Sequence, residues 1–143
     1  MKKIYYTLIA LFITAVAFGQ SSNNIVGKWT TIDDETGQAK SVVEIIQKPD
    51  GKYYGKIDKL LMKPENSNCV NCKDDRKNKP LTGLEIIRGL SKEGKEFTGG
   101  TIVDPKTGKV YKCTITRNGD KLQVRGYIGF SLIGRTQTWN IVK

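Results

Sequence analysis

The strongest constraint on the fold is a series of short β-rich runs, separated by turn-forming residues about every ten positions. No window after residue 20 has a sustained helical period of apolar residues. Turn chemistry marks the joints, as at Asn118-Gly119, where residues that tolerate positive φ stand together. The predicted strands span residues 25–32, 41–47, 52–61, 83–90, 96–103, 109–117, 121–127 and 136–142.

Apolar and polar residues alternate within several of these runs. Tyr111, Cys113 and Ile115 fall on one face of their predicted strand, and Leu122 and Val124 fall on one face of the next. Such strands have one face in a core and one in water. The pattern predicts an all-β fold, a single eight-stranded antiparallel up-and-down β-barrel, because closure removes exposed edges. A barrel of this size is either filled by side chains or holds one small ligand.

The N-terminal segment has the features of a signal peptide. Lys2 and Lys3 precede an apolar run over residues 4–18, and Ala17-Phe18-Gly19 predicts cleavage before Gln20. The run is shorter than the about 20 residues of a spanning helix, so a retained membrane anchor is the less favoured alternative. We therefore expect a signal peptide at 1–19 and a barrel domain at 20–143. The mature protein would be periplasmic or secreted, with no integral membrane segment.

Composition narrows the chemistry. The chain has no His, which removes Ser-His-Asp and Cys-His mechanisms and His-ligated metal sites. The acidic group Asp33-Asp34-Glu35 lies at a predicted turn, where the carboxylates do not face each other as glycoside hydrolysis requires. We expect no metal and no cofactor, and an enzyme based on carboxylates or thiols is the least favoured function. The net charge is +10, but the basic residues are scattered, which does not indicate nucleic-acid binding.

Two cysteines stand close together in the polar segment 62–80. Cys69 and Cys72 form a CxxC pair, and the third cysteine is Cys113. An exported protein in an oxidising compartment favours a disulfide between Cys69 and Cys72. A metal site and a redox or reactive thiol pair remain as alternatives. Cys113 shares a face with apolar residues, which predicts a buried thiol.

Residues in the first and last predicted strands resemble a known arrangement. Gly27-Lys28-Trp29 lies in the first predicted strand, and Arg135 precedes the last, which holds Trp139. This resembles the lipocalin pattern, in which an arginine packs across the tryptophan of a Gly-x-Trp motif. The resemblance implies that Gly27, Trp29 and Arg135 close the base of the barrel.

A longer pattern of motifs covers nearly the whole chain after residue 26. These motifs include Gly51-Lys52-Tyr53-Tyr54-Gly55, Cys69-Val70-Asn71-Cys72, Lys79-Pro80-Leu81-Thr82-Gly83-Leu84, Gly99-Gly100-Thr101-Ile102-Val103-Asp104-Pro105 and Gly134-Arg135-Thr136-Gln137-Thr138-Trp139. Together they are similar to the secreted bacterial family called domain of unknown function 2147. The resemblance implies a small lipocalin-like barrel exported from the cytoplasm of a Gram-negative bacterium, and it carries no established activity or ligand.

These features favour non-enzymatic binding of a small apolar or amphipathic ligand. Aromatic residues would line the mouth or cavity, and Arg125 would pair with an anionic head group. The alternative is a filled barrel that acts as an envelope interaction or structural module, through the apolar segment 126–134 or the basic exterior, with a protein partner that the sequence does not identify. The candidate ligand-binding residues are Tyr54, Tyr111, Arg125, Tyr127, Phe130 and Trp139.

Overall fold

The computed structural model describes residues 23–130 and 133–143. The predicted signal peptide and its cleavage site before Gln20 lie outside these residues. Each predicted strand overlaps an observed one. The strands are β1 (Gly27–Ile32), β2 (Ala39–Gln47), β3 (Tyr53–Leu60), β4 (Glu85–Glu93), β5 (Glu96–Val103), β6 (Val110–Asn118), β7 (Lys121–Tyr127) and β8 (Gly134–Ile141).

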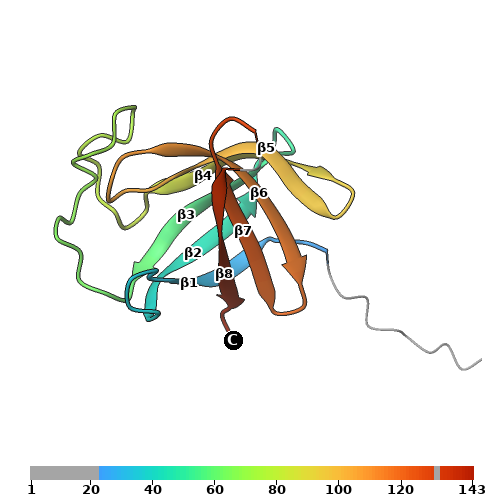
Figure 1. Ribbon diagram of the computed structural model, residues 1–143, viewed down its shortest axis with the longest axis horizontal. Helices are drawn as coiled ribbons and strands as arrows, with labels where there is room; N and C mark the ends of the chain where they lie inside the picture. The colour runs from blue at the N-terminus through green and yellow to red at the C-terminus, as the bar shows by residue number, and fades with distance from the viewer. Residues whose placement is uncertain (1–22, 131–132) are drawn as a thin grey trace, which may run out of the picture.

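The strands form one closed barrel in the order β1 to β8, and every neighbouring pair is antiparallel (Figure 1). The predicted eight-stranded up-and-down barrel is therefore confirmed. This topology places the β1–β2, β3–β4, β5–β6 and β7–β8 connections at one end, called here the open end, and the other three connections at the closed end. In the part of the chain that the structure describes, no helix is long and apolar enough to cross a membrane.

Large side chains fill the barrel from the closed end to its middle. Trp29, Phe97 and Leu122 have no exposed surface, and Trp139 is buried beside them in the same core. Tyr53 meets Phe97 edge to face, with the ring centroids 4.9 Å apart. These residues alternate along their strands with more exposed ones, as the period of two predicts. This part of the barrel is therefore a packed core.

Trp29 is covered by an arginine, but the residue differs from the predicted one. The Arg117 guanidinium lies 5.2 Å from the centroid of the Trp29 ring. Arg117 also donates hydrogen bonds to the carbonyl oxygens of Asn24 and Gly119. Trp29 itself donates from Nε1 to the carbonyl oxygen of Ile25, at 2.8 Å. Gly27, two residues earlier, has a φ of 141°, which a side chain would disfavour.

The prediction that Arg135 lies across Trp29 is wrong. The residue of β8 opposite Trp29 is Ile141, and Arg135 is at the other end of that strand. Six residues of extended chain separate them by about 20 Å at roughly 3.3 Å per residue. Arg135 lies at the open end, where it pairs with Asp34.

A disulfide organises the long β3–β4 connection at residues 61–84. Cys69 and Cys72 are bonded to each other, as predicted, and both are buried. Asn71, between them, donates from Nδ2 to the carbonyl oxygen of Lys106 in the β5–β6 connection. Cys113 is the free, buried cysteine, and burial raises the pKa of its thiol to about 12, so it stays protonated and unreactive.

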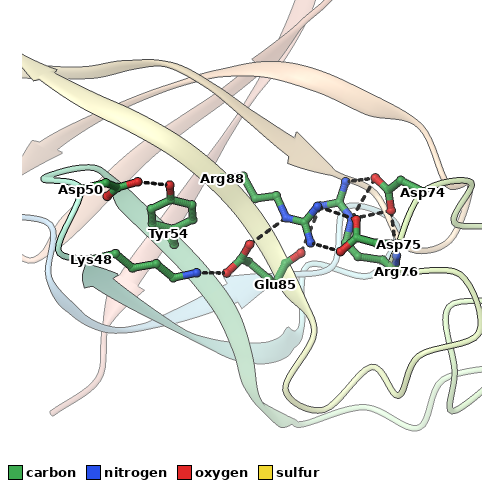
Figure 2. A network of polar contacts seen from close by, with 8 residues as sticks. All are labelled: Lys48, Asp50, Tyr54, Asp74, Asp75, Arg76, Glu85 and Arg88. Atoms are coloured by element: carbon green, nitrogen blue, oxygen red, sulfur yellow. Dashed lines mark hydrogen bonds and ion pairs between the residues drawn. The ribbon is translucent and has the colours of Figure 1, made fainter.

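Ion pairs hold the same connection against the outer face of β4 (Figure 2). Arg76 is only 2% exposed. It donates hydrogen bonds from Nε and Nη2 to the Asp74 carboxylate and from Nη1 to the carbonyl oxygen of Glu85. Arg88 donates from both terminal nitrogens to Asp75, at 2.8 Å each, and from Nε to Glu85. The hydrogen bonds from Arg88 hold the pKa of the Asp75 carboxyl below its usual value. The network therefore holds the β3–β4 connection in a fixed position on the outer face of β4.

Candidate binding site at the open end

The strand register identifies which residues face the barrel interior near the open end. Cys113 lies opposite Gly126, and Gly126 lies opposite Arg135, so these three residues share one face of the sheet. That face is the inner one, because Cys113 is fully buried there. Gln137 is on the same face, opposite the buried Val124. The inner wall at this end is therefore built by β6, β7 and β8.

Exposure of the inner wall rises from the core toward the open end. Trp139 is 2% exposed, and Gln137, two residues closer to the open end, is partly exposed. The side chain of Arg135, two residues farther, is 70% exposed. Tyr111 and Gly126 are also partly exposed. Since water reaches these inward-facing groups, the barrel is accessible at its open end and filled below.

Gly126 leaves space in this wall. A Cβ atom at Gly126 would lie 3.4 Å from the Cβ of Tyr111 and 3.5 Å from the Cγ2 of Ile102, which is ordinary contact. Its backbone does not have a positive φ, so the conformation itself does not require glycine. The absent side chain therefore leaves a methyl-sized gap between an aromatic and an aliphatic group, and the surface around it is apolar.

The rim above this space is polar and carries a cation. Asp34, in the β1–β2 connection, accepts hydrogen bonds from Arg135, at 2.6 Å, and from Nε2 of Gln137, at 2.8 Å. The amide oxygen of Gln137 accepts a bond from Nε1 of Trp139, at 2.9 Å. This chain of contacts joins the rim to the core and fixes the Arg135 guanidinium beside the opening.

Two of the six predicted ligand-binding residues face inward. Tyr111 belongs to the accessible wall at the open end, whereas Trp139 is part of the packed core. Phe130 lies on the β7–β8 connection and is 89% exposed.

The other three predicted residues lie on the outer face. Tyr54 alternates with the buried Tyr53, donates to the Asp50 carboxylate and lies under the Lys48 ammonium, 4.1 Å from its ring centroid (Figure 2). Arg125 donates to the hydroxyl of Thr136 across the outer face of β7 and β8. Tyr127 alternates with the inward-facing Gly126. The six residues therefore do not form a single site.

Sequence reasoning missed Gly126, Gln137 and Asp34 as parts of this site. The signal for Gln137 was available, because Arg135, Gln137 and Trp139 have the spacing of residues on one strand face. Nothing in the sequence indicated that Asp34 would reach β8. Arg135 was predicted to close the base of the barrel, whereas the structure places it at the open end beside Asp34.

A hollow of about 430 Å³ lies beside the open end, where the disulfide-bonded connection meets β6. Its wall includes the apolar side chains of Val103, Val110 and Ile128. Lys73 and Lys109 contribute the cations of its lining, and the Asp74 carboxylate, which also lines it, forms an ion pair with Arg76. The hollow thus combines apolar surface with positive charge.

Comparisons with known proteins agree with the barrel. Residues 27–140 match the family model described as "Uncharacterized protein conserved in bacteria (DUF2147)". No curated protein matches the chain. The chain is similar to a solved structure described as "Protein HP1028 from the human pathogen Helicobacter pylori belongs to the lipocalin family", with a TM-score of 0.73, 18% identity and 84% of each chain covered. At this identity, the similarity establishes a lipocalin-like fold.

Proposed function

Because the chain belongs to the DUF2147 family and has a lipocalin-like barrel, we propose that it is a non-enzymatic protein that binds a small amphipathic ligand at its open end. The observation that carries the proposal is the accessible inner wall at Gly126, below the Arg135 guanidinium and above the packed core. An apolar chain would contact Tyr111 and Ile102. An anionic head group would meet Arg135 at the rim.

The ion pair at the rim does not prevent this binding. The side chains of Arg135 and Asp34 are 70% and 38% exposed, and a pair in such surroundings contributes about 0–1 kcal/mol. A carboxylate or phosphate on the ligand can therefore replace Asp34 at small cost. A guanidinium presents a planar fork of donors to such a group, which a lysine does not.

The test is an affinity measurement with a medium-chain carboxylate. We expect decanoate to bind the parent protein, and Gly126→Leu to weaken binding by about tenfold or more, because the added side chain fills the space beside Tyr111. Arg135→Ala should weaken the binding of decanoate more than that of decanol. Isothermal titration calorimetry would measure both ligands.

Thr101→Leu provides the matched control. Thr101 lies opposite the exposed Lys112 on the outer face of β5 and β6, so the same side chain is added outside the barrel. This variant should bind decanoate like the parent protein. Failure of the parent to bind, or equal binding by Gly126→Leu and the parent, would contradict the proposed site and favour an interaction module with a filled barrel.

We also propose that the protein is exported and acts in the periplasm or outside the cell. The support is the charged, apolar and small-residue pattern of residues 1–19. The intact mass of the protein from the periplasmic or medium fraction should correspond to a chain that starts at Gln20. A mass that retains Met1 would contradict export through cleavage.

A further inference from the structure

The β7–β8 connection carries an exposed apolar cluster. Phe130, Ile133 and Ile128 are 89%, 73% and 56% exposed, the three highest values for large hydrophobic side chains among the described residues. Isolated exposed apolar residues are ordinary, but a group of them at one turn indicates a contact surface. We call these three residues the apolar tip.

Backbone hydrogen bonds join the three residues of the apolar tip. The amide of Ile128 donates to the carbonyl oxygen of Ile133, at 3.0 Å, and the amide of Ile133 donates to that of Phe130, at 3.3 Å. Gly129 has a φ of 67°, which permits the turn between them. The exposure of the three side chains leaves the apolar tip available for contact with a partner.

Three lysines lie beside the apolar tip on its β6 side. Lys73 and Lys109 line the same hollow as Ile128, and Lys112 lies opposite Tyr127, just before the connection. These three lysines form no ion pair with any of the described residues. Of the nearby acids, Asp74 forms two-pronged hydrogen bonds with Arg76, and Asp34 forms an ion pair with Arg135. Asp104, next to Val103, accepts a hydrogen bond from the backbone amide of Lys106, and the three lysines outnumber it. The local charge available to a partner is positive.

The small size of the apolar tip favours a lipid bilayer over a protein as its partner. A stable protein interface buries about 800 Å² on each side, which three side chains do not supply. A bilayer needs no matching shape, and apolar groups enter its headgroup boundary by about 5–10 Å while cations stay at the anionic surface. We propose that the open end docks on an anionic phospholipid bilayer, with the apolar tip inserted and Lys73, Lys109 and Lys112 at the lipid phosphates. This goes beyond the proposed function and does not depend on it.

A tryptophan at position 130 provides a direct test. Trp29 and Trp139 are buried, so a change in the emission of Phe130→Trp on adding vesicles will report mainly on the new side chain. We expect vesicles of phosphatidylglycerol to shift that emission to the blue, and lipids brominated near the headgroup to quench it. No shift with these vesicles would overturn the proposal.

Paired substitutions test the two parts of the surface. Phe130→Ser with Ile133→Ser should weaken binding to phosphatidylglycerol vesicles by about tenfold or more in a sedimentation assay. Val26→Ser with Val142→Ser is the matched control, since these residues are 42% and 41% exposed beside the closed end, and it should bind like the parent. Lys73→Glu with Lys109→Glu should also weaken binding.

Equal binding to phosphatidylcholine and phosphatidylglycerol would contradict the role of the lysines. Parent-like vesicle binding by the double serine variant would contradict insertion of the apolar tip. If the parent forms a dimer that the double serine variant does not, and neither binds vesicles, the surface contacts a second copy of the chain and the proposal is overturned. Because Phe130, Ile133, Lys73 and Lys109 are exposed, their variants should keep the parent melting temperature.

Discussion

Replacing Trp29 with alanine should lower the free energy of unfolding by about 3–5 kcal/mol, the range for removing a fully buried tryptophan. Trp29 has no exposed surface and fills the closed end of the barrel. Its loss leaves a cavity there, removes the donor to the Ile25 carbonyl oxygen and leaves Arg117 without its aromatic partner. Urea denaturation followed by circular dichroism measures the effect without relying on the deleted chromophore.

The two arginines at opposite ends of the barrel serve as comparisons. Arg117→Ala should lower the free energy of unfolding by about 1–3 kcal/mol, because a cation–π contact and two bonds to carbonyl oxygens are lost. Arg135→Ala should lower it by less than about 1 kcal/mol, since its ion pair is exposed. A Trp29→Ala variant that unfolds like the parent, or a larger effect at Arg135 than at Arg117, would contradict this account of the closed end.

Gly108→Ala should lower the free energy of unfolding by about 2–4 kcal/mol, because backbone strain and a steric clash act at the same residue. Gly108 has a φ of 74°, and a Cβ there would lie 1.8 Å from the carbonyl oxygen of Asn71. That oxygen belongs to the backbone inside the disulfide-bonded turn, so the β3–β4 connection must move away. Thermal unfolding and limited proteolysis within residues 61–84 would measure both consequences.

Gly119→Ala separates strain from contact. Gly119 has a similar φ of 62°, but a Cβ there would meet nothing within 4 Å. This variant should lose about 1–2 kcal/mol from the left-handed conformation alone and should keep the protease resistance of residues 61–84. Equal stability and equal cleavage in the two variants would contradict the contact between Gly108 and Asn71.

Local patterns in the sequence were sufficient for the strands and the disulfide. Alternation at Cys113, Ile115, Leu122 and Val124 identifies an inner face without knowledge of the rest of the fold. The same alternation places Arg117 on that face, two residues after Ile115, so the sequence pattern also indicated Arg117 as a partner for Trp29. The lipocalin resemblance implied that an arginine packs across Trp29. The strand register determines that this arginine is Arg117.

The binding residues were harder to predict because they were selected by residue type. Tyr54 is aromatic but follows the buried Tyr53, so it has to face outward. A glycine gives no such signal, although Gly126 matters through the side chain that it lacks. The contact between Asp34 and Gln137 joins residues 103 positions apart, and only closure of the barrel brings them together.

The junction between β1 and β8 sets how the ring is kept closed. It has two residue pairs, whereas β7 and β8 share seven. Closing a flexible loop of about 110 residues costs roughly 4 kcal/mol of chain entropy, apart from a constant contribution, and each hydrogen bond returns about 1 kcal/mol. The few backbone bonds at the junction do not offset that entropy. Burial of Trp29 from β1 and of Trp139 from β8 supplies the remaining stabilisation. Closure of the barrel therefore depends more on packing in its core than on backbone hydrogen bonds between β1 and β8.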